Sequence, residues 1–159
     1  RKCFADWIWT AEWRVGLICR CRNLAKRSLG SPNFLVMPLP DVSIHPALDK
    51  ERVTELMNQT PNDRSLFIRL NALFSDEGTT LIQDIVVGLR MNDRSTLHDA
   101  IHKVKGSSAA MGASRVYAMS NAAIEICRND LDLADLAELP SLLETEYAAY
   151  CEEAKQYLE

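Results

Sequence analysis

The sequence predicts an all-α protein, an antiparallel four-helix bundle with one or two additional N-terminal helices. From residue 48 onward, apolar residues recur at helical spacing, and no segment shows the alternation of a half-buried strand. Proline, glycine and Asn-Asp breaks separate these runs by only a few residues. Because short connections make successive helices antiparallel neighbours, a bundle is the expected packing. The 159 residues suffice for one domain with its own core.

Residues 1–29 are predicted to form a basic, Trp-rich helical extension. Apolar side chains recur there at helical spacing, and all three tryptophans lie in this segment. It contains seven Lys or Arg residues but only two Asp or Glu residues. A basic amphipathic helix can lie on an anionic membrane surface, so contact of residues 1–27 with a membrane is one alternative. Packing on the bundle, on a partner subunit or on an upstream domain is favoured, because Trp rings are ordinary packing anchors.

Residues 30–47 are predicted to be a Pro-rich linker. They hold four of the six prolines, which interrupt any helical pattern. Such a segment is semi-extended and suits a tether to an upstream module. His45 precedes Pro46 and is expected to be a loop residue.

Residues 48–159 are predicted to form the bundle. Asp49 is a helix N-cap for a short first helix. Pro61 opens a second apolar run, which is expected to bend or restart at Gly78. Asn92 and Asp93 then form a turn that leads into the next helix.

The last part of the predicted bundle has equally clear boundaries. Gly112 ends the third run as a C-cap glycine would. The following helix stops near Asn129, and Pro140 begins the last helix.

Residues 102–113 read HKVKGSSAAMGA and lie within the predicted third helix of the bundle. Helical spacing places one set of side chains on a common core face: Leu97, Ile101, Val104, Ser108 and Met111. His102 points away from that face, and Lys105, Gly106 and Ala109 lie on its side at neighbouring offsets. The pattern predicts a solvent-facing imidazole beside a cation, under a turn that carries few side-chain atoms.

These features suit a histidine that carries a phosphoryl group. A neutral imidazole offers one ring nitrogen as a nucleophile. A phosphoryl group adds nearly two negative charges, which a lysine one turn away partly offsets. Gly106 costs a helix about 1 kcal/mol relative to alanine. In return it leaves clearance for the acidic loop of a partner.

The string resembles the signature of the histidine phosphotransfer (HPt) family, a histidine followed by x-x-K-G-S-S and then a G-A or G-L pair. The matching residues are His102, Lys105, Gly106, Ser107, Ser108, Gly112 and Ala113. The resemblance implies that His102 is the phosphoacceptor, that Lys105 stabilises the phosphoryl group and that Gly106 and Ala109 give clearance for docking. His98 and Arg128 are candidate supporting residues. The family often has a Gln or Glu that hydrogen-bonds the imidazole, where this chain has Ile124.

By this resemblance, the chain accepts a phosphoryl group from a receiver-domain aspartate and passes it to another receiver, either alone or as the C-terminal module of a hybrid sensor kinase. The chain has no ATP-binding motif, so we expect a phosphoryl carrier and not a kinase. It is expected to bind no cofactor, with Mg²⁺ on the partner receiver. Two alternatives remain open: a non-phosphorylated bundle that docks receivers or a kinase, and the phosphoacceptor domain of a chemotaxis-type kinase.

Composition narrows the function classes further. The net charge is −4, and residues 31–159 hold eleven basic against twenty acidic side chains, which argues against nucleic-acid binding. Five cysteines without disulfide spacing indicate a reducing cytoplasm.

Three further features of the sequence bear on metals, membranes and completeness. His98 and His102 are spaced so that both could bind one metal ion, but the positive charge of Lys105 opposes a cation there, so no metal is expected. No apolar run is long enough for a membrane span. The chain begins with Arg1, so a fragment or processed product is expected.

Overall fold

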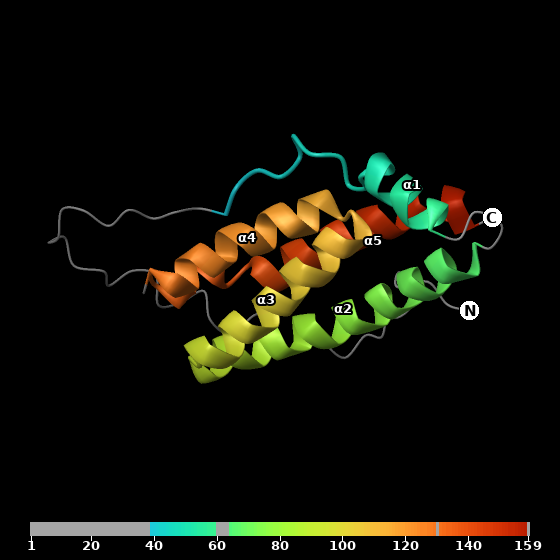
Figure 1. The fold of residues 1–159 in the computed structure, drawn as a ribbon. Coiled ribbons are helices and arrows are strands. Elements are labelled where there is room, and N and C mark those ends of the chain that lie inside the picture. The colour runs from blue at the N-terminus through green and yellow to red at the C-terminus, as the bar shows by residue number, and fades with distance from the viewer. Residues whose placement is uncertain (1–38, 60–63, 130, 159) are drawn as a thin grey trace, which may run out of the picture. The chain divides into compact units, whose positions relative to one another are not determined.

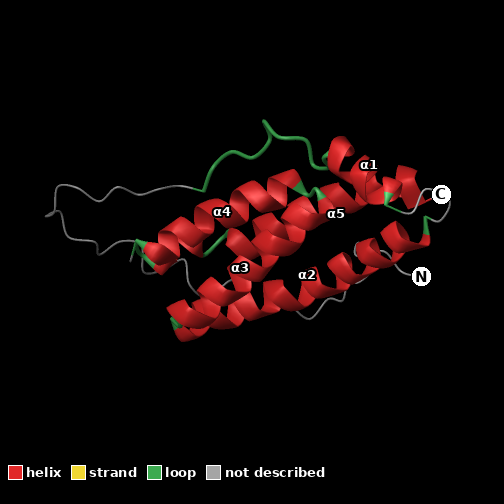
Figure 2. Cartoon of the chain, viewed as in Figure 1, coloured by secondary structure: helices red, strands yellow, loops and turns green. Residues whose placement is uncertain are grey.

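The computed structural model describes residues 39–59, 64–129 and 131–158 (Figure 1). This part of the chain contains five α-helices and one 3-10 helix and no strand, which confirms the all-α prediction for it (Figure 2). The elements are α1 (Lys50–Asn58), α2 (Ser65–Met91), α3 (Arg94–Met111), α4 (Ser114–Arg128), the 3-10 helix η3 (Leu133–Leu136) and α5 (Leu139–Leu158). The extension predicted for residues 1–29 and the first part of the linker lie outside the described residues.

The helices pack through one shared apolar interior. α2 contacts α3 and α5, α4 contacts α3 and α5, and α1 contacts α2 and α3. In Figure 1, α2, α3 and α4 lie next to one another, and α5 passes behind them. The largest fully buried side chains come from all four long helices and include Phe67, Ile85, Leu97, Ile101, Ile124, Leu143, Tyr147 and Tyr150. None of the helices in the described ranges is long and apolar enough to cross a membrane.

A tight turn reverses the chain between α2 and α3. Asn92 adopts the left-handed conformation with φ 53°, and the side chain of Asp93 accepts hydrogen bonds from the backbone N–H groups of Ser95 and Thr96. The Thr96 hydroxyl also donates to the Asp93 carboxylate at 2.7 Å, and these bonds hold the pKa of Asp93 below its ordinary value. The predicted turn is confirmed, and it determines where α3 begins.

Both ends of α3 are tied to other helices by arginine. At the start, the Arg94 guanidinium donates to the carbonyl oxygen of Cys127 in the last turn of α4 at 3.1 Å and to that of Leu131 just after α4 at 2.8 Å. At the end, Arg52 of α1 donates through Nε to the carbonyl oxygen of Ala110 at 3.1 Å. These contacts satisfy backbone carbonyls that have no partner inside their own helix.

The junction of α1 with the end of α3 confirms two predicted caps. Gly112 has φ 73°, the left-handed conformation that favours glycine at a helix C-terminus. Its carbonyl oxygen accepts from the N–H of Asp49 at 2.7 Å, while the Asp49 side chain caps α1. α1 is therefore attached directly to the helix that carries His102.

The expected bend at Gly78 is wrong, because α2 runs without interruption from Ser65 to Met91. Gly78 faces the buried ring of Tyr147, and a Cβ there would lie 2.5 Å from Tyr147 Cε1. The glycine allows α5 to approach α2 closely and does not break the helix.

The part of the predicted linker that the structure describes, residues 39–47, is a loop that packs on the bundle. Val42 and Ala47 are buried, and Arg115 of α4 donates to the carbonyl oxygen of His45 at 2.7 Å. His45 lies in this loop with an exposed side chain, as predicted.

Candidate functional site

The helix α3 has a buried face and an open face. The five predicted core residues are all buried, and four of them are fully so: Leu97, Ile101, Val104 and Ser108, with Met111 nearly so. The prediction of the core face is therefore confirmed. His102 is exposed on the other side of the helix, where a partner protein can reach the imidazole.

His98 lies one turn before His102 on the same helix. The two imidazole rings stack with their centroids 6.1 Å apart and an angle of 19° between their planes. His98 is half-buried, and its Nδ1 lies 3.5 Å from a carboxylate oxygen of Asp99. One face of the His102 ring is therefore flanked by a second imidazole. No group of three or more His, Cys, Asp or Glu side chains in the described segments could hold a metal ion.

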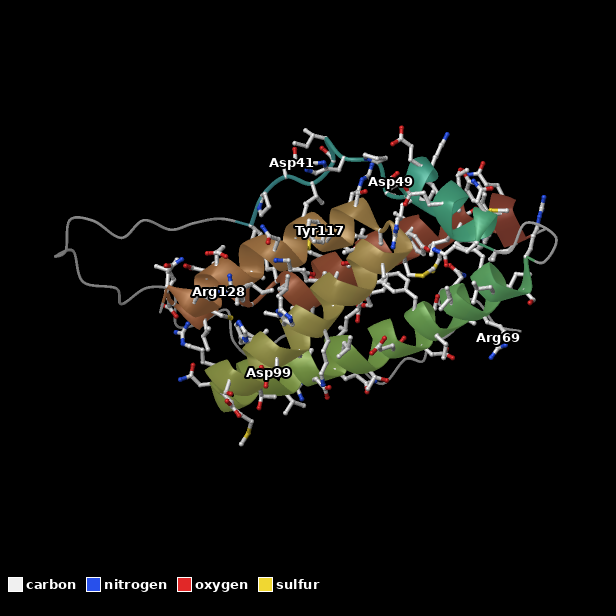
Figure 3. All side chains as sticks on the ribbon, in the orientation of Figure 1. Asp41, Asp49, Arg69, Asp99, Tyr117 and Arg128 are labelled. Atoms are coloured by element: carbon white, nitrogen blue, oxygen red, sulfur yellow. The ribbon has the colours of Figure 1, made fainter. Side chains whose placement is uncertain are left out.

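Lys105 extends from α3 toward α4. Its side chain is half-buried, and Nζ lies 5.8 Å from the centroid of the Tyr117 ring. Tyr117 projects from the first half of α4 and is 40% exposed (Figure 3). The sequence analysis missed Tyr117, because no motif marks it and its position depends on how α4 packs against α3.

The turn above His102 is open. A Cβ added to Gly106 would meet no heavy atom within 4 Å beyond its own helical turn, and Ala109 is exposed with only a methyl group. The hydroxyl groups of Ser107 and Ser108 donate to backbone carbonyls of α3 itself, those of Lys103 and Lys105 at 3.1 Å and 3.0 Å. Neither serine is therefore oriented as a nucleophile.

The far end of α4 carries Arg128, which is half-exposed (Figure 3). Its guanidinium forms an ion pair with the neighbouring Glu125 at 3.2 Å, so the candidate Arg128 is engaged within α4. Ile124, where the family often has an amide or carboxylate, is fully buried and apolar. Across the described parts of the chain, no hydrogen bond from α4 holds the imidazole of His102.

A cavity of about 590 Å³ lies beside this site. Its walls come from the loop before α1, from α1, from the end of α3 and from the first half of α4, and include His45, Arg52, Ala109, Tyr117 and Asn121. Tyr117 therefore contacts the Lys105 ammonium through its ring and also lines the cavity.

A comparison with protein families identifies the family of the chain that carries this site. The family model of the Hpt domain matches residues 69–157. The chain belongs to the Hpt domain family. The matched region includes all of α3 and α4 and most of α2 and α5. No curated protein and no solved structure matches the chain significantly. Membership associates the chain with histidine phosphotransfer in two-component phosphorelays, which involves receiver domains.

Proposed function

We propose that this Hpt domain is a phosphorelay intermediate, in which His102 accepts a phosphoryl group from the aspartate of one receiver domain and passes it to that of another. The observation that carries the proposal is the open face of α3, where an exposed imidazole lies beside Lys105 and below the uncrowded turn at Gly106. The antiparallel four-helix bundle that α2 to α5 would form presents this face to the partner.

The proposed reaction needs few groups from this chain. A ring nitrogen of His102 attacks the phosphorus of the aspartyl phosphate, the P–N bond forms, and the P–O bond to the receiver breaks with the carboxylate as leaving group. The reverse steps on a second receiver regenerate the free imidazole. Positioning and charge stabilisation dominate catalysis of phosphoryl transfer. Mg²⁺, which we expect on the receiver, would neutralise charge on the phosphoryl oxygens there.

Lys105 is the cation of this chain in the proposed site. It lies three residues after His102, so the two side chains are neighbours on the helix surface. Its ammonium would form charge-assisted hydrogen bonds to phosphoryl oxygens, each worth about 1.5–3 kcal/mol. Gly106 and Ala109 would give the receiver's acidic loop room to reach the imidazole, because neither adds bulk to the turn above it.

His98 is proposed to support His102 through the observed stack, since Ile124 offers no hydrogen bond. Arg128 would assist only by leaving its ion pair with Glu125. The buried Ile124 also favours a second candidate function, a bundle that docks receivers without carrying phosphate. The two functions differ in one observable, a covalent phosphohistidine.

The test is transfer from a receiver that has been labelled on its aspartate in the presence of Mg²⁺. We expect wild-type protein to acquire an acid-labile, base-stable label and His102→Gln to acquire none. His45→Gln is the matched control and must take label as wild type does. His98→Gln keeps the acceptor and must also take label, although loss of the stack is expected to slow transfer. Because His102 is exposed, the free energy of unfolding of His102→Gln should change by no more than about 0.5 kcal/mol. Label on His102→Gln would refute the site, and wild-type protein that binds receivers without taking label would favour the docking bundle.

A further inference from the structure

Tyr117 lies at the surface of the protein, on the helix that packs beside α3. The ring is not packed into the interior but is 40% exposed at the surface between α3 and α4. Its backbone lies in the first turn of α4, where the N–H of Tyr117 donates to the carbonyl oxygen of the fully buried Ala113 at 2.9 Å. An exposed ring on a rigid helical turn is suited to hold something that lies beside it.

The group beside it is the ammonium of Lys105, 5.8 Å from the ring centroid. The negative face of an aromatic ring attracts a cation at this distance. Among the residues that the structure describes, no carboxylate forms an ion pair with Lys105. An acidic partner would compete with a phosphoryl group for the ammonium, whereas an aromatic ring attracts the ammonium and leaves its charge and its three donors available.

A free lysine side chain samples many rotamers, so an ammonium that must meet an incoming phosphoryl group benefits from being held in advance. Lys105 and His102 are neighbours on the surface of α3. The contact with Tyr117 therefore restricts the Lys105 ammonium to the α4 side of His102.

We propose that Tyr117 is a positioning residue of the phosphoryl site, which acts by holding the Lys105 ammonium. The phosphoryl role rests on the proposed function above, whereas the contact between ring and ammonium does not. Only the aromatic face is required, so phenylalanine replaces Tyr117 and leucine does not. Because the ring lies at the surface and borders a cavity, its removal leaves the bundle folded.

The contact is tested first without phosphate. Magnetic resonance signals of the Lys105 ε-methylene group in wild type, Tyr117→Phe and Tyr117→Leu report the ring current of residue 117. We expect the signals to be displaced upfield in the first two proteins and to return to the position of an unconstrained lysine in Tyr117→Leu. Signals that do not move between wild type and Tyr117→Leu would overturn the proposal.

The role in transfer is tested by a double-mutant cycle with Lys105→Met. Tyr117→Leu should slow transfer about three- to fivefold, both from a receiver and from phosphoramidate, and Tyr117→Phe should restore the wild-type rate. In the Lys105→Met background, Tyr117→Leu should change neither rate.

The other outcomes identify which idea has failed. If Tyr117→Leu slows transfer equally in the Lys105→Met background, or slows only the reaction with the receiver, Tyr117 contacts the partner and does not act through Lys105. If wild-type protein takes no label at all, the proposed function fails and the phosphoryl role with it. If wild-type protein takes label normally but the Lys105 signals are the same in wild type and Tyr117→Leu, only the positioning role of Tyr117 is refuted and the proposed function stands.

Discussion

Three glycines lie inside the described helices, and the structure separates them into two kinds. Gly78 and Gly88 of α2 are buried at close approaches: a Cβ would lie 2.5 Å from the Tyr147 ring at the first and 3.1 Å from Leu97 at the second. A Cβ on Gly106 of α3 would meet no heavy atom within 4 Å beyond its own helical turn. Each glycine costs its helix about 1 kcal/mol relative to alanine, and close packing offsets that cost only in α2.

Close packing explains the glycines of α2 but does not explain Gly106. At Gly78 and Gly88 the missing side chain lets a neighbouring element approach, so the benefit is internal to the molecule. At Gly106 the space stays open on the face that carries His102. In the proposed function, the benefit comes from outside the chain, because the open space would admit a receiver's acidic loop.

The largest effect is expected from Gly106→Leu, which adds bulk beside His102. Transfer from a phosphorylated receiver should fall by about a hundredfold or more, corresponding to about 2.7 kcal/mol. Labelling by phosphoramidate should stay within about threefold, because a small donor needs no docking surface. Lys103→Leu, an equally exposed change on α3, is the control and should transfer normally. Normal exchange of Gly106→Leu with the receiver would remove the clearance argument.

Gly78→Ala should destabilise the bundle by about 1–3 kcal/mol, since overpacking a core forces neighbouring side chains out of position. The new methyl group would lie 2.5 Å from Cε1 and 2.8 Å from Cζ of Tyr147. That ring is fully buried and packs against the tilted ring of Phe74 with centroids 4.8 Å apart, so it has little room to move. Urea denaturation measures the change, and a free energy of unfolding equal to that of wild type would show that the ring yields.

The buried tyrosines of α5 are also expected to make the stability of the protein depend on pH. Burial raises the pKa of Tyr147 and of Tyr150 well above the ordinary tyrosine value, because the phenolate is poorly solvated there. Their contribution to stability is therefore fully present below the unfolded-state pKa near 10 and is lost as the pH rises above it. At pH 10.5 the loss should be about 1–2 kcal/mol for the pair. Urea denaturation at pH 8 and pH 10.5 measures it, and the difference should shrink by about half in Tyr150→Phe; no reduction would contradict the assignment.

The smallest expected effect is an increase in stability. Gly106→Ala should raise the free energy of unfolding by about 0.5–1 kcal/mol, because alanine restricts the unfolded chain and meets no obstacle in the folded one. The sign is opposite to that of Gly78→Ala, although both changes add one methyl group to the middle of a helix. Thermal denaturation of the two variants side by side checks the contrast, and a loss of stability in Gly106→Ala would end it.

The local features of this protein could be predicted from its amino-acid sequence. The all-α class, the caps at Asp49 and Gly112, the turn at Asn92 and Asp93, and the burial of one face of α3 all follow from spacing and residue type within a few residues along the chain. These signals are local because a helix turn spans 3.6 residues and a cap contacts the first or last turn. The exposure of His102 follows from the same period.

The packing of the helices brings together side chains whose contacts no local pattern predicts. It paired Lys105 with Tyr117, turned Gly78 toward Tyr147, and tied Arg52 of α1 to the end of α3. Residues that are remote in sequence meet only when the apolar faces of the helices pack, and the rotation of each helix in that packing depends on all its neighbours at once. For that reason a candidate phosphoacceptor could be proposed from a twelve-residue string, while the ring beside its lysine and the purpose of two of the three helix glycines could not.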